Sequence, residues 1–106
     1  MVTSLSPQHL RERLDAGEAL VVLDVREPEE IAIARLDGAV EIPMQDIPAR
    51  LAELDSTAEI VVVCHHGMRS AHVASFLAEQ GFARVANLTG GIDAWSLTVD
   101  PSVARY

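Results

Sequence analysis

Two short apolar runs constrain the fold of this chain more than any other feature of its sequence. Residues 19–25 read ALVVLDV and residues 60–63 read IVVV, and both runs have the length of a β-strand. A continuous apolar run is typical of a strand whose two faces are both covered, as in a parallel sheet. Residues 84–88 and, over a shorter stretch, residues 39–42 predict two further strands. We therefore expect a mostly parallel central sheet.

Helical patterns alternate with these strands. Ser6 followed by Pro7 predicts the start of a first helix, which Gly17 ends. In this helix Leu10 and Leu14 lie on one face. Further helices are predicted to begin at Glu27-Pro28 and at Asp46, the latter with Ile47, Leu51 and Leu54 at helical spacing. Another is predicted from Arg69 to Gln80, with Val73, Ala74 and Leu77 facing inward and Gly81 ending it. A last short helix is predicted after Gly90-Gly91 and runs through Trp95. Strands that alternate with short helices predict an α/β fold, and the length suits one domain over residues 1–106.

The composition limits the class of partner. Sixteen acids stand against eight arginines and no lysine, which gives a net charge of -8. Such a chain is not expected to bind nucleic acid or anionic lipid, and it repels small anions at long range, so an anion site has to be local. No run approaches the roughly 18 apolar residues of a membrane span, and no secretory signal is apparent. With one cysteine and no internal disulfide, we expect a cytoplasmic protein.

The single cysteine, Cys64, directly follows the second apolar run. Working sites of open α/β sheets lie at the carboxyl ends of the strands. The loop His65-His66-Gly67-Met68 comes next, before the helix predicted from Arg69. Amides of this loop and of the helix N-terminus are placed to converge on the sulfur, an anion cradle that favours thiolate over thiol. Gly67 permits the turn, and Arg69 adds a positive charge at its rim.

Cys64 has a second interpretation, because a lone cysteine beside a β-branched run is often a small buried hydrophobe. Its place between a strand and a glycine-containing loop favours the reactive interpretation. Cys64, His65, His66 and His72 also allow a metal site. However, structural zinc ligands usually come in spaced pairs on two elements, so we expect no metal.

Charged residues near the first apolar run have a structural interpretation. Asp24 and Arg26 are expected to form a pair that closes the end of the strand and orients the loops beneath the site. The acids Glu27, Glu29 and Glu30 are interpreted as a solvated helix start, where negative charge suits the helix dipole.

Three motifs in order resemble the rhodanese-like sulfurtransferase family. They are Leu23-Asp24-Val25-Arg26-Glu27-Pro28-Glu29-Glu30, Cys64-His65-His66-Gly67-Met68-Arg69-Ser70 and Leu88-Thr89-Gly90-Gly91-Ile92-Asp93-Ala94-Trp95, with Gly38-Ala39 and Ile42-Pro43 between the first two. The resemblance covers nearly the whole chain and implies a rhodanese-like α/β domain with helices on both faces of the sheet. The chain departs from the family pattern at Ile31, at residues 34–36 and at Ala104, where the family commonly has an aromatic residue, Gly-His-Ile and a proline.

The resemblance also implies a sulfurtransferase that needs no cofactor. The Cys64 thiolate would take the outer sulfur of a donor such as thiosulfate, hold it as a persulfide, and pass it to cyanide or a thiol. The residues implied to surround the substrate are His65, His66, Gly67, Met68 and Arg69, with Arg69 on the anionic donor. The partners implied are a small anionic sulfur donor and a cyanide or thiol acceptor, which includes a protein acceptor.

Two other functions stay open. A cysteine phosphatase or arsenate reductase also holds an oxyanion on a Cys-loop-Arg turn, but its loop is typically longer than the four residues between Cys64 and Arg69. A rhodanese-like module can instead act as a persulfide relay or a binding module for a separate protein. The presence of Cys64 argues against a pure binding module.

Overall fold

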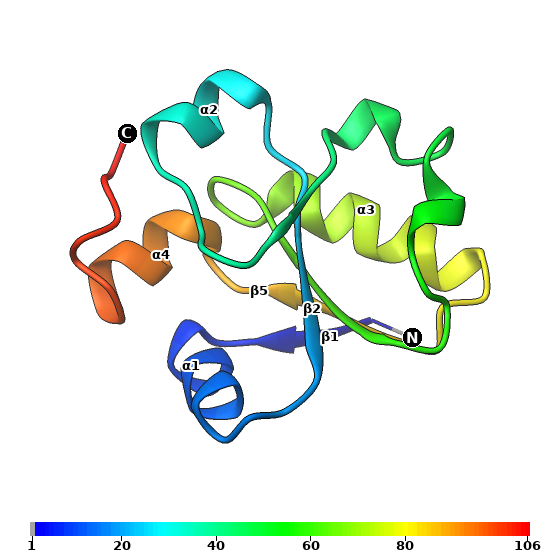
Figure 1. The fold of residues 1–106 in the computed structure, drawn as a ribbon, viewed down its shortest axis with the longest axis horizontal. Coiled ribbons are helices and arrows are strands. Elements are labelled where there is room, and N and C mark those ends of the chain that lie inside the picture. The colour runs from blue at the N-terminus through cyan, green and yellow to red at the C-terminus, as the bar shows by residue number, and fades with distance from the viewer. Residues whose placement is uncertain (1) are drawn as a thin grey trace.

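The computed structural model describes residues 2–106, which form a five-stranded sheet. The strands are β1 (Val2–Leu5), β2 (Leu20–Asp24), β3 (Val40–Glu41), β4 (Glu59–Val63) and β5 (Arg84–Leu88). Their order across the sheet is β1-β5-β4-β2-β3, and each neighbouring pair is parallel (Figure 1). The expected parallel sheet is confirmed, and its strands all end at the same edge.

The second apolar run forms the centre of this sheet. β4 lies between β2 and β5, with Val61 opposite both Val22 and Ala86. Residues 60–63 are 0% exposed, as expected of a strand that is covered on both faces. Burial of each such side chain contributes about 1.5–3 kcal/mol. Cys64, which follows β4, is therefore attached to one of the most tightly packed parts of the molecule.

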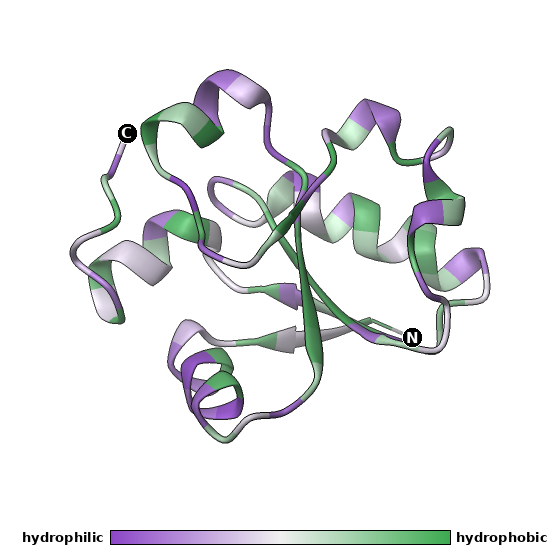
Figure 2. Cartoon of the chain, viewed as in Figure 1, coloured by the Kyte–Doolittle hydropathy of each residue, from purple (hydrophilic) through white to green (hydrophobic). Residues whose placement is uncertain are grey.

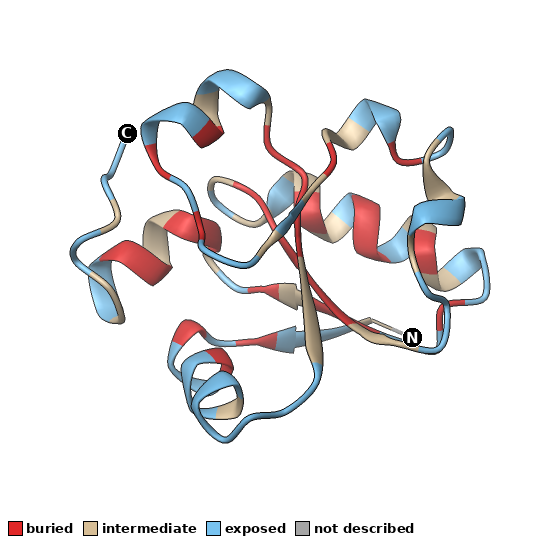
Figure 3. Ribbon diagram, viewed as in Figure 1, coloured by how far each residue is buried: buried red, intermediate tan, exposed pale blue. Residues whose placement is uncertain are grey.

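Helices cover both faces of the sheet, as expected. α3 (Met68–Glu79) packs on one face together with two 3₁₀ turns, η1 (Met44–Asp46) and η2 (Leu51–Glu53). α1 (Pro7–Asp15) and α4 (Gly91–Thr98) pack on the other face, and Figure 1 shows α1 and α3 on opposite sides of the strands. α2 (Pro28–Ile33) follows β2. Apolar segments in Figure 2 coincide with buried ones in Figure 3, chiefly in the strands and along α3.

Local signals explain where two helices begin. The amide of His9 donates to Ser6 Oγ at 3.1 Å, and Pro7 is the first residue of α1. Glu27 and Glu30 form a capping box around the start of α2, which satisfies amides that a helix leaves free. Both predicted starts are confirmed.

The fold differs from the expected one in two places. Val2–Leu5 form a strand, β1, which the sequence pattern does not predict because VTSL is short and half polar. The helix expected from Asp46 is replaced by η1 and η2, so Ile47, Leu51 and Leu54 do not share one helix. The Arg50 amide still donates to Asp46 O at 3.0 Å, but Arg50 then leaves helical geometry at φ -110° and ψ 16°, which ends this turn before Leu51.

The remaining boundaries shift by a few residues. β2 is shorter than the run 19–25, β3 has two residues, and α4 continues past Trp95 to Thr98. Leu10 is buried, whereas Leu14 on the same helix is 37% exposed. Within residues 2–106, no helix has both the length and the apolar character needed to cross a membrane.

Candidate active site

Cys64 begins the connection between the central strand and a helix. Val63 ends β4, and Met68 begins α3. The turn depends on Gly67, whose φ of +103° lies in a region that other residues rarely adopt. A Cβ on Gly67 would also lie 3.3 Å from the amide nitrogen of Gly90. The strand–loop–helix arrangement expected around the cysteine is therefore present.

The sulfur of Cys64 is buried and hydrogen-bonded. The residue is 1% exposed, and it belongs to an apolar cluster with Val62 and Val73. The Gly67 amide donates to Cys64 Sγ at 3.1 Å, and the hydroxyl of Ser70 lies 3.3 Å from the same sulfur. Across residues 2–106, the Gly67 amide is the one loop amide bonded to this sulfur. The several converging amides that were expected are thus reduced to one amide in this structure.

Asn87 completes a ring of hydrogen bonds next to the sulfur. The Ser70 hydroxyl donates to Asn87 Oδ1 at 2.5 Å, and Asn87 Nδ2 donates to the carbonyl of Gly67 at 3.1 Å. The sequence analysis assigns no role to Asn87. The signal that identifies it is its position in β5, two residues after the core residue Val85 and so on the same face of the sheet. Asparagine is depleted in strands, which makes this polar position conspicuous.

The N-terminus of α4 holds the loop through two backbone hydrogen bonds to carbonyl groups of the loop. The amide of Ile92 donates to Cys64 O at 2.8 Å, and the amide of Asp93 donates to His65 O at 3.1 Å. A Cβ on Gly91 would lie 2.5 Å from each of these two oxygens. The glycine pair, expected only to make a turn, therefore also permits this close approach between α4 and the loop.

Arg69 lies in the first turn of α3, and its guanidinium is paired with Glu30 of α2. Nη1 and Nη2 of Arg69 donate to Glu30 Oε1 and Oε2 at 2.6 and 2.8 Å. These hydrogen bonds lower the pKa of Glu30 to about 2 and raise the pKa of Arg69 above its usual value. The interpretation of Glu30 as part of a solvated helix start is wrong. The carboxylate offsets the positive charge that Arg69 was expected to present.

Tyr106 packs beside the loop, a contact that no local pattern predicts. Its ring stacks on the ring of His65 at 3.9 Å and 9°, and His65 in turn lies 3.8 Å from the ring of His66. The Tyr106 hydroxyl donates to Glu30 Oε2 at 2.8 Å. The two loop histidines and the Arg69–Glu30 pair are thus connected through one tyrosine. Met68, the remaining loop residue of the predicted site, is 84% exposed.

The predicted set of possible metal ligands is only partly brought together. His65, His66 and Asp93 each place one ligand atom within 4.8 Å of the others, while Cys64 and His72 do not join them. His65 Nε2 is buried without a hydrogen-bond partner. However, the rings of His65 and His66 lie against each other, with centroids 3.8 Å apart and an interplanar angle of 30°. The carboxylate of Asp93 accepts a hydrogen bond from Arg105 at 2.9 Å. We therefore assign this group no metal.

The expected pair of Asp24 and Arg26 is confirmed. Both side chains are 0% exposed, and Arg26 Nη2 donates to Asp24 Oδ2 at 2.6 Å. The same Nη2 donates to the carbonyl of Ala34 at 2.6 Å. Burial alone would lower the pKa of Arg26, but the hydrogen bonds with Asp24 and Tyr106 outweigh it and raise the pKa. The pair fixes the chain after β2 against the connection that follows α2.

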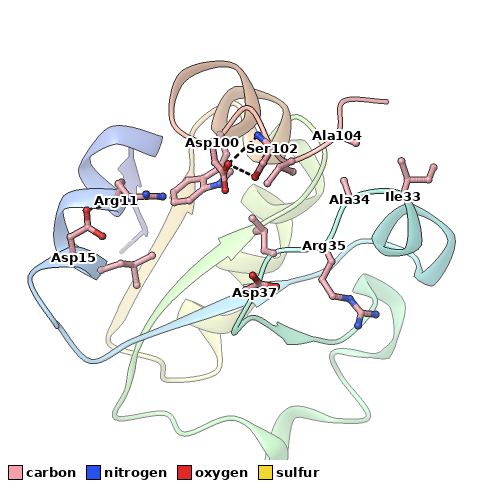
Figure 4. A pocket seen from close by; sticks show the side chains of 13 residues that line it. Arg11, Asp15, Ile33, Ala34, Arg35, Asp37, Asp100, Ser102 and Ala104 are labelled. Atoms are coloured by element: carbon pink, nitrogen blue, oxygen red, sulfur yellow. Dashed lines mark hydrogen bonds and ion pairs between the residues drawn. The ribbon is translucent and has the colours of Figure 1, made fainter.

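A cavity of about 440 Å³ lies apart from Cys64, and none of residues 64–70 lines it. It is formed by α1, by residues 33–37, by Trp95 and by residues 100–104. Figure 4 shows Arg11 turned toward Asp15 and Asp100 joined to Ser102. Because this cavity does not include the chain's single thiol, we place the candidate chemistry at Cys64.

The chain is similar to known proteins over nearly its whole length. The Rhodanese-like domain family matches residues 6–98. The chain is 42% identical over 100 residues to the putative sulfurtransferase YtwF of Bacillus subtilis, covering 94% of this chain and 96% of the relative. It is 32% identical over 101 residues to the thiosulfate sulfurtransferase GlpE of Ectopseudomonas mendocina, covering 95% and 91%. A rhodanese-like domain protein from Staphylococcus aureus has a similar structure, with a TM-score of 0.85, 30% identity and 98% of each chain covered.

Proposed function

The chain belongs to the rhodanese-like domain family, and we propose that it is a sulfurtransferase that carries sulfur as a persulfide on Cys64. The observation that carries this proposal is the position of Cys64 at the end of the central strand, with its Sγ bonded to the Gly67 amide. A single thiol presented on a rigid strand suits a nucleophile that must return to the same geometry after each transfer.

In the proposed first half-reaction, the Cys64 thiolate attacks the outer sulfur of a donor such as thiosulfate. A new S–S bond forms on Cys64 as the S–S bond of thiosulfate breaks, and sulfite leaves with the electron pair of the broken bond. The product is a persulfide whose terminal sulfur carries the negative charge. Amides of the loop are the donors available to this sulfur, because they belong to the same short turn as Gly67.

In the second half-reaction, an acceptor attacks the terminal sulfur and Cys64 leaves as thiolate. With cyanide the product is thiocyanate, and with a thiolate it is a new persulfide on the acceptor. Two half-reactions that share one covalent intermediate give ping-pong kinetics. No cofactor is needed, because the sulfur moves between nucleophiles without net electron supply.

We propose that His65, His66, Gly67, Met68 and Arg69 form the substrate side of the site. Arg69 is the group that would bind an anionic donor, in competition with Glu30 for the same guanidinium. GlpE is named for its use of thiosulfate, which supports thiosulfate as the first donor to test. An unpaired, reactive thiol persists best in a reducing compartment, so we propose the cytoplasm.

A relay of sulfur to a separate protein is the second candidate. Met68 is 84% exposed, and the side chain of His66 is 62% exposed. An exposed apolar side chain at the end of the loop, next to an accessible imidazole, suits contact with a protein acceptor. Rapid passage of sulfur to a partner thiol, together with poor turnover on cyanide, would favour the relay over a free-standing enzyme.

Mass spectrometry tests the chemical class directly. After treatment with thiosulfate, the peptide that contains Cys64 is expected to gain roughly 32 Da, the mass of one sulfur atom, and to lose it on addition of cyanide. The Cys64→Ser variant should fold normally and give neither the adduct nor thiocyanate. Thiocyanate formation by Cys64→Ser, or release of phosphate from an aryl phosphate by the unmodified protein, would contradict the proposal.

A further inference from the structure

We infer that Asn87 is a positioning residue that holds Cys64 in its thiol form through the hydroxyl of Ser70. The contacts around Cys64 form a closed ring. Cys64 Sγ lies 3.3 Å from Ser70 Oγ, Ser70 Oγ lies 2.5 Å from Asn87 Oδ1, and Asn87 Nδ2 lies 3.1 Å from Gly67 O. The Gly67 amide closes the ring on the sulfur at 3.1 Å.

The orientation of the Asn87 amide follows from its partners. The carbonyl oxygen of Gly67 only accepts hydrogen bonds, so the amide atom that faces it must be the NH₂ group. The other amide atom, which faces Ser70, is then the oxygen Oδ1. Because Oδ1 only accepts, the Ser70 hydroxyl must donate to it.

A count of protons gives the consequence for Cys64. A serine hydroxyl has one proton, and Ser70 uses it on Asn87. Ser70 therefore presents only lone pairs to Cys64 Sγ, and the proton between sulfur and oxygen has to come from the thiol. The ring is complete when Cys64 is a thiol. Once the thiol proton leaves to solvent, the hydroxyl can stabilise the thiolate only by turning away from Asn87.

Asn87 Oδ1 and the Cys64 thiolate thus compete for the single proton of the Ser70 hydroxyl. Ser70 is fully buried, so its hydroxyl cannot donate to solvent instead. This role of Asn87 rests on the proposed function, because it takes Cys64 as the reacting group. Asn87 keeps the resting thiol less nucleophilic, which protects a free sulfur from oxidation between transfers.

Other charged and titratable groups lie around this end of the sheet. They are Arg69 of α3, with Glu30 of α2 and Tyr106 beside it, the loop residues His65 and His66, Asp93 of α4, and the buried pair Asp24 and Arg26 after β2. All of them stay unchanged in the variants proposed below. Differences between the variants therefore report on the Ser70–Asn87 contact.

The test is a double-mutant cycle on the rate of alkylation of Cys64 by iodoacetamide as a function of pH. In Asn87→Ala the hydroxyl of Ser70 becomes free to donate to the thiolate. We expect the midpoint of the pH profile to fall by about one pH unit, which raises the rate near neutral pH by up to about tenfold. In the Ser70→Ala background, Asn87→Ala should move the midpoint by less than about 0.3 units, because the hydroxyl is absent.

A merely structural role of Asn87 gives a different result. A loosened loop would raise the plateau rate in both backgrounds without moving the midpoint. An equal shift in both backgrounds, no shift, or a shift to higher pH would overturn the inference. Asn87→Val, which suits a strand, repeats the test if Asn87→Ala unfolds. Alkylation needs no sulfur donor, so its result does not depend on formation of the persulfide. Absence of the persulfide adduct in mass spectrometry would contradict the proposed function, and it would leave the outcome of the double-mutant cycle unaffected.

Discussion

Arg69 and Glu30 form a two-pronged ion pair between α3 and α2, with N–O distances of 2.6 and 2.8 Å. The pair places a carboxylate on the one arginine expected to bind an anionic sulfur donor. It therefore offsets the charge that we propose binds the donor, in a chain whose net charge is already -8.

Glu30→Gln should improve the use of thiosulfate. The variant keeps the size of the side chain but leaves the positive charge of Arg69 without a competing anion. We expect the KM for thiosulfate to fall by roughly fivefold at low ionic strength, with a smaller effect at high salt. Glu29→Gln is the matched control, because Glu29 is exposed on the same helix and changes the net charge equally. An equal effect in the two variants would refute a local role for Glu30.

The same pair should make stability depend on acid. The pKa of Glu30 is lowered from 4.5 to about 2 in the folded protein, so its contribution is complete above about pH 4.5 and is lost as the pH falls toward 2. After allowance for solvent at this partly exposed pair, we expect the wild type to exceed Glu30→Gln by about 1–2 kcal/mol at pH 7. Urea unfolding at pH 7, 4 and 2.5 measures this difference. A difference that stays constant across these pH values would contradict the prediction.

Gly91→Ala should displace the loop that carries Cys64. The added Cβ would lie 2.5 Å from the carbonyl oxygens of Cys64 and His65, and the φ of +62° disfavours alanine independently. We expect a loss of more than about 2 kcal/mol of stability, together with slower sulfur transfer. Gly17→Ala is the control, since Gly17 has a φ of +78° but nothing within 4 Å of the added atom. Its smaller loss, about 1 kcal/mol, measures the backbone effect alone.

Asp24→Ala should be among the most destabilising substitutions in the chain. It leaves the guanidinium of Arg26 buried at 0% exposure without its carboxylate, which costs about 3–5 kcal/mol. The double variant Asp24→Ala/Arg26→Leu should lose less than the sum of the two single variants, because it leaves no unpaired charge. Thermal and urea unfolding measure these losses. Asp37→Ala, at an exposed position, is the control, and an equal loss there would show that burial of the pair is unimportant.

The parts of the fold that the sequence predicts are those specified by local patterns. The apolar run at 60–63 predicts the buried central strand, and Ser6-Pro7 predicts the start of α1. The errors also have local causes. The strand β1 is too short and too polar to be recognised, and the backbone of Arg50 interrupts a segment whose apolar spacing otherwise suggests a helix.

The candidate site is less predictable, because its decisive contacts join residues that are distant in sequence. Cys64 and its loop follow from the strand–loop–helix pattern. The partners of that loop do not: Glu30 reaches Arg69 across 39 positions, and Tyr106 reaches Glu30 across 76. Charge pattern alone therefore suggests a solvated Glu30 and a free Arg69, and only the folded structure shows that the two side chains pair with each other.

The hydrogen bonds that hold the Cys64 loop also set the order in which the site can form. Asn87, Ile92 and Asp93 supply hydrogen bonds to the turn that begins at Cys64, and all three come later in the chain. A chain that ends before Asn87 lacks all three of these partners. Nascent or truncated forms that end before Asn87 therefore hold Cys64 in an unorganised segment, where it is open to oxidants and mixed disulfides. The thiol of Cys64 becomes selective in its reactions only when β5 and α4 have folded against the loop.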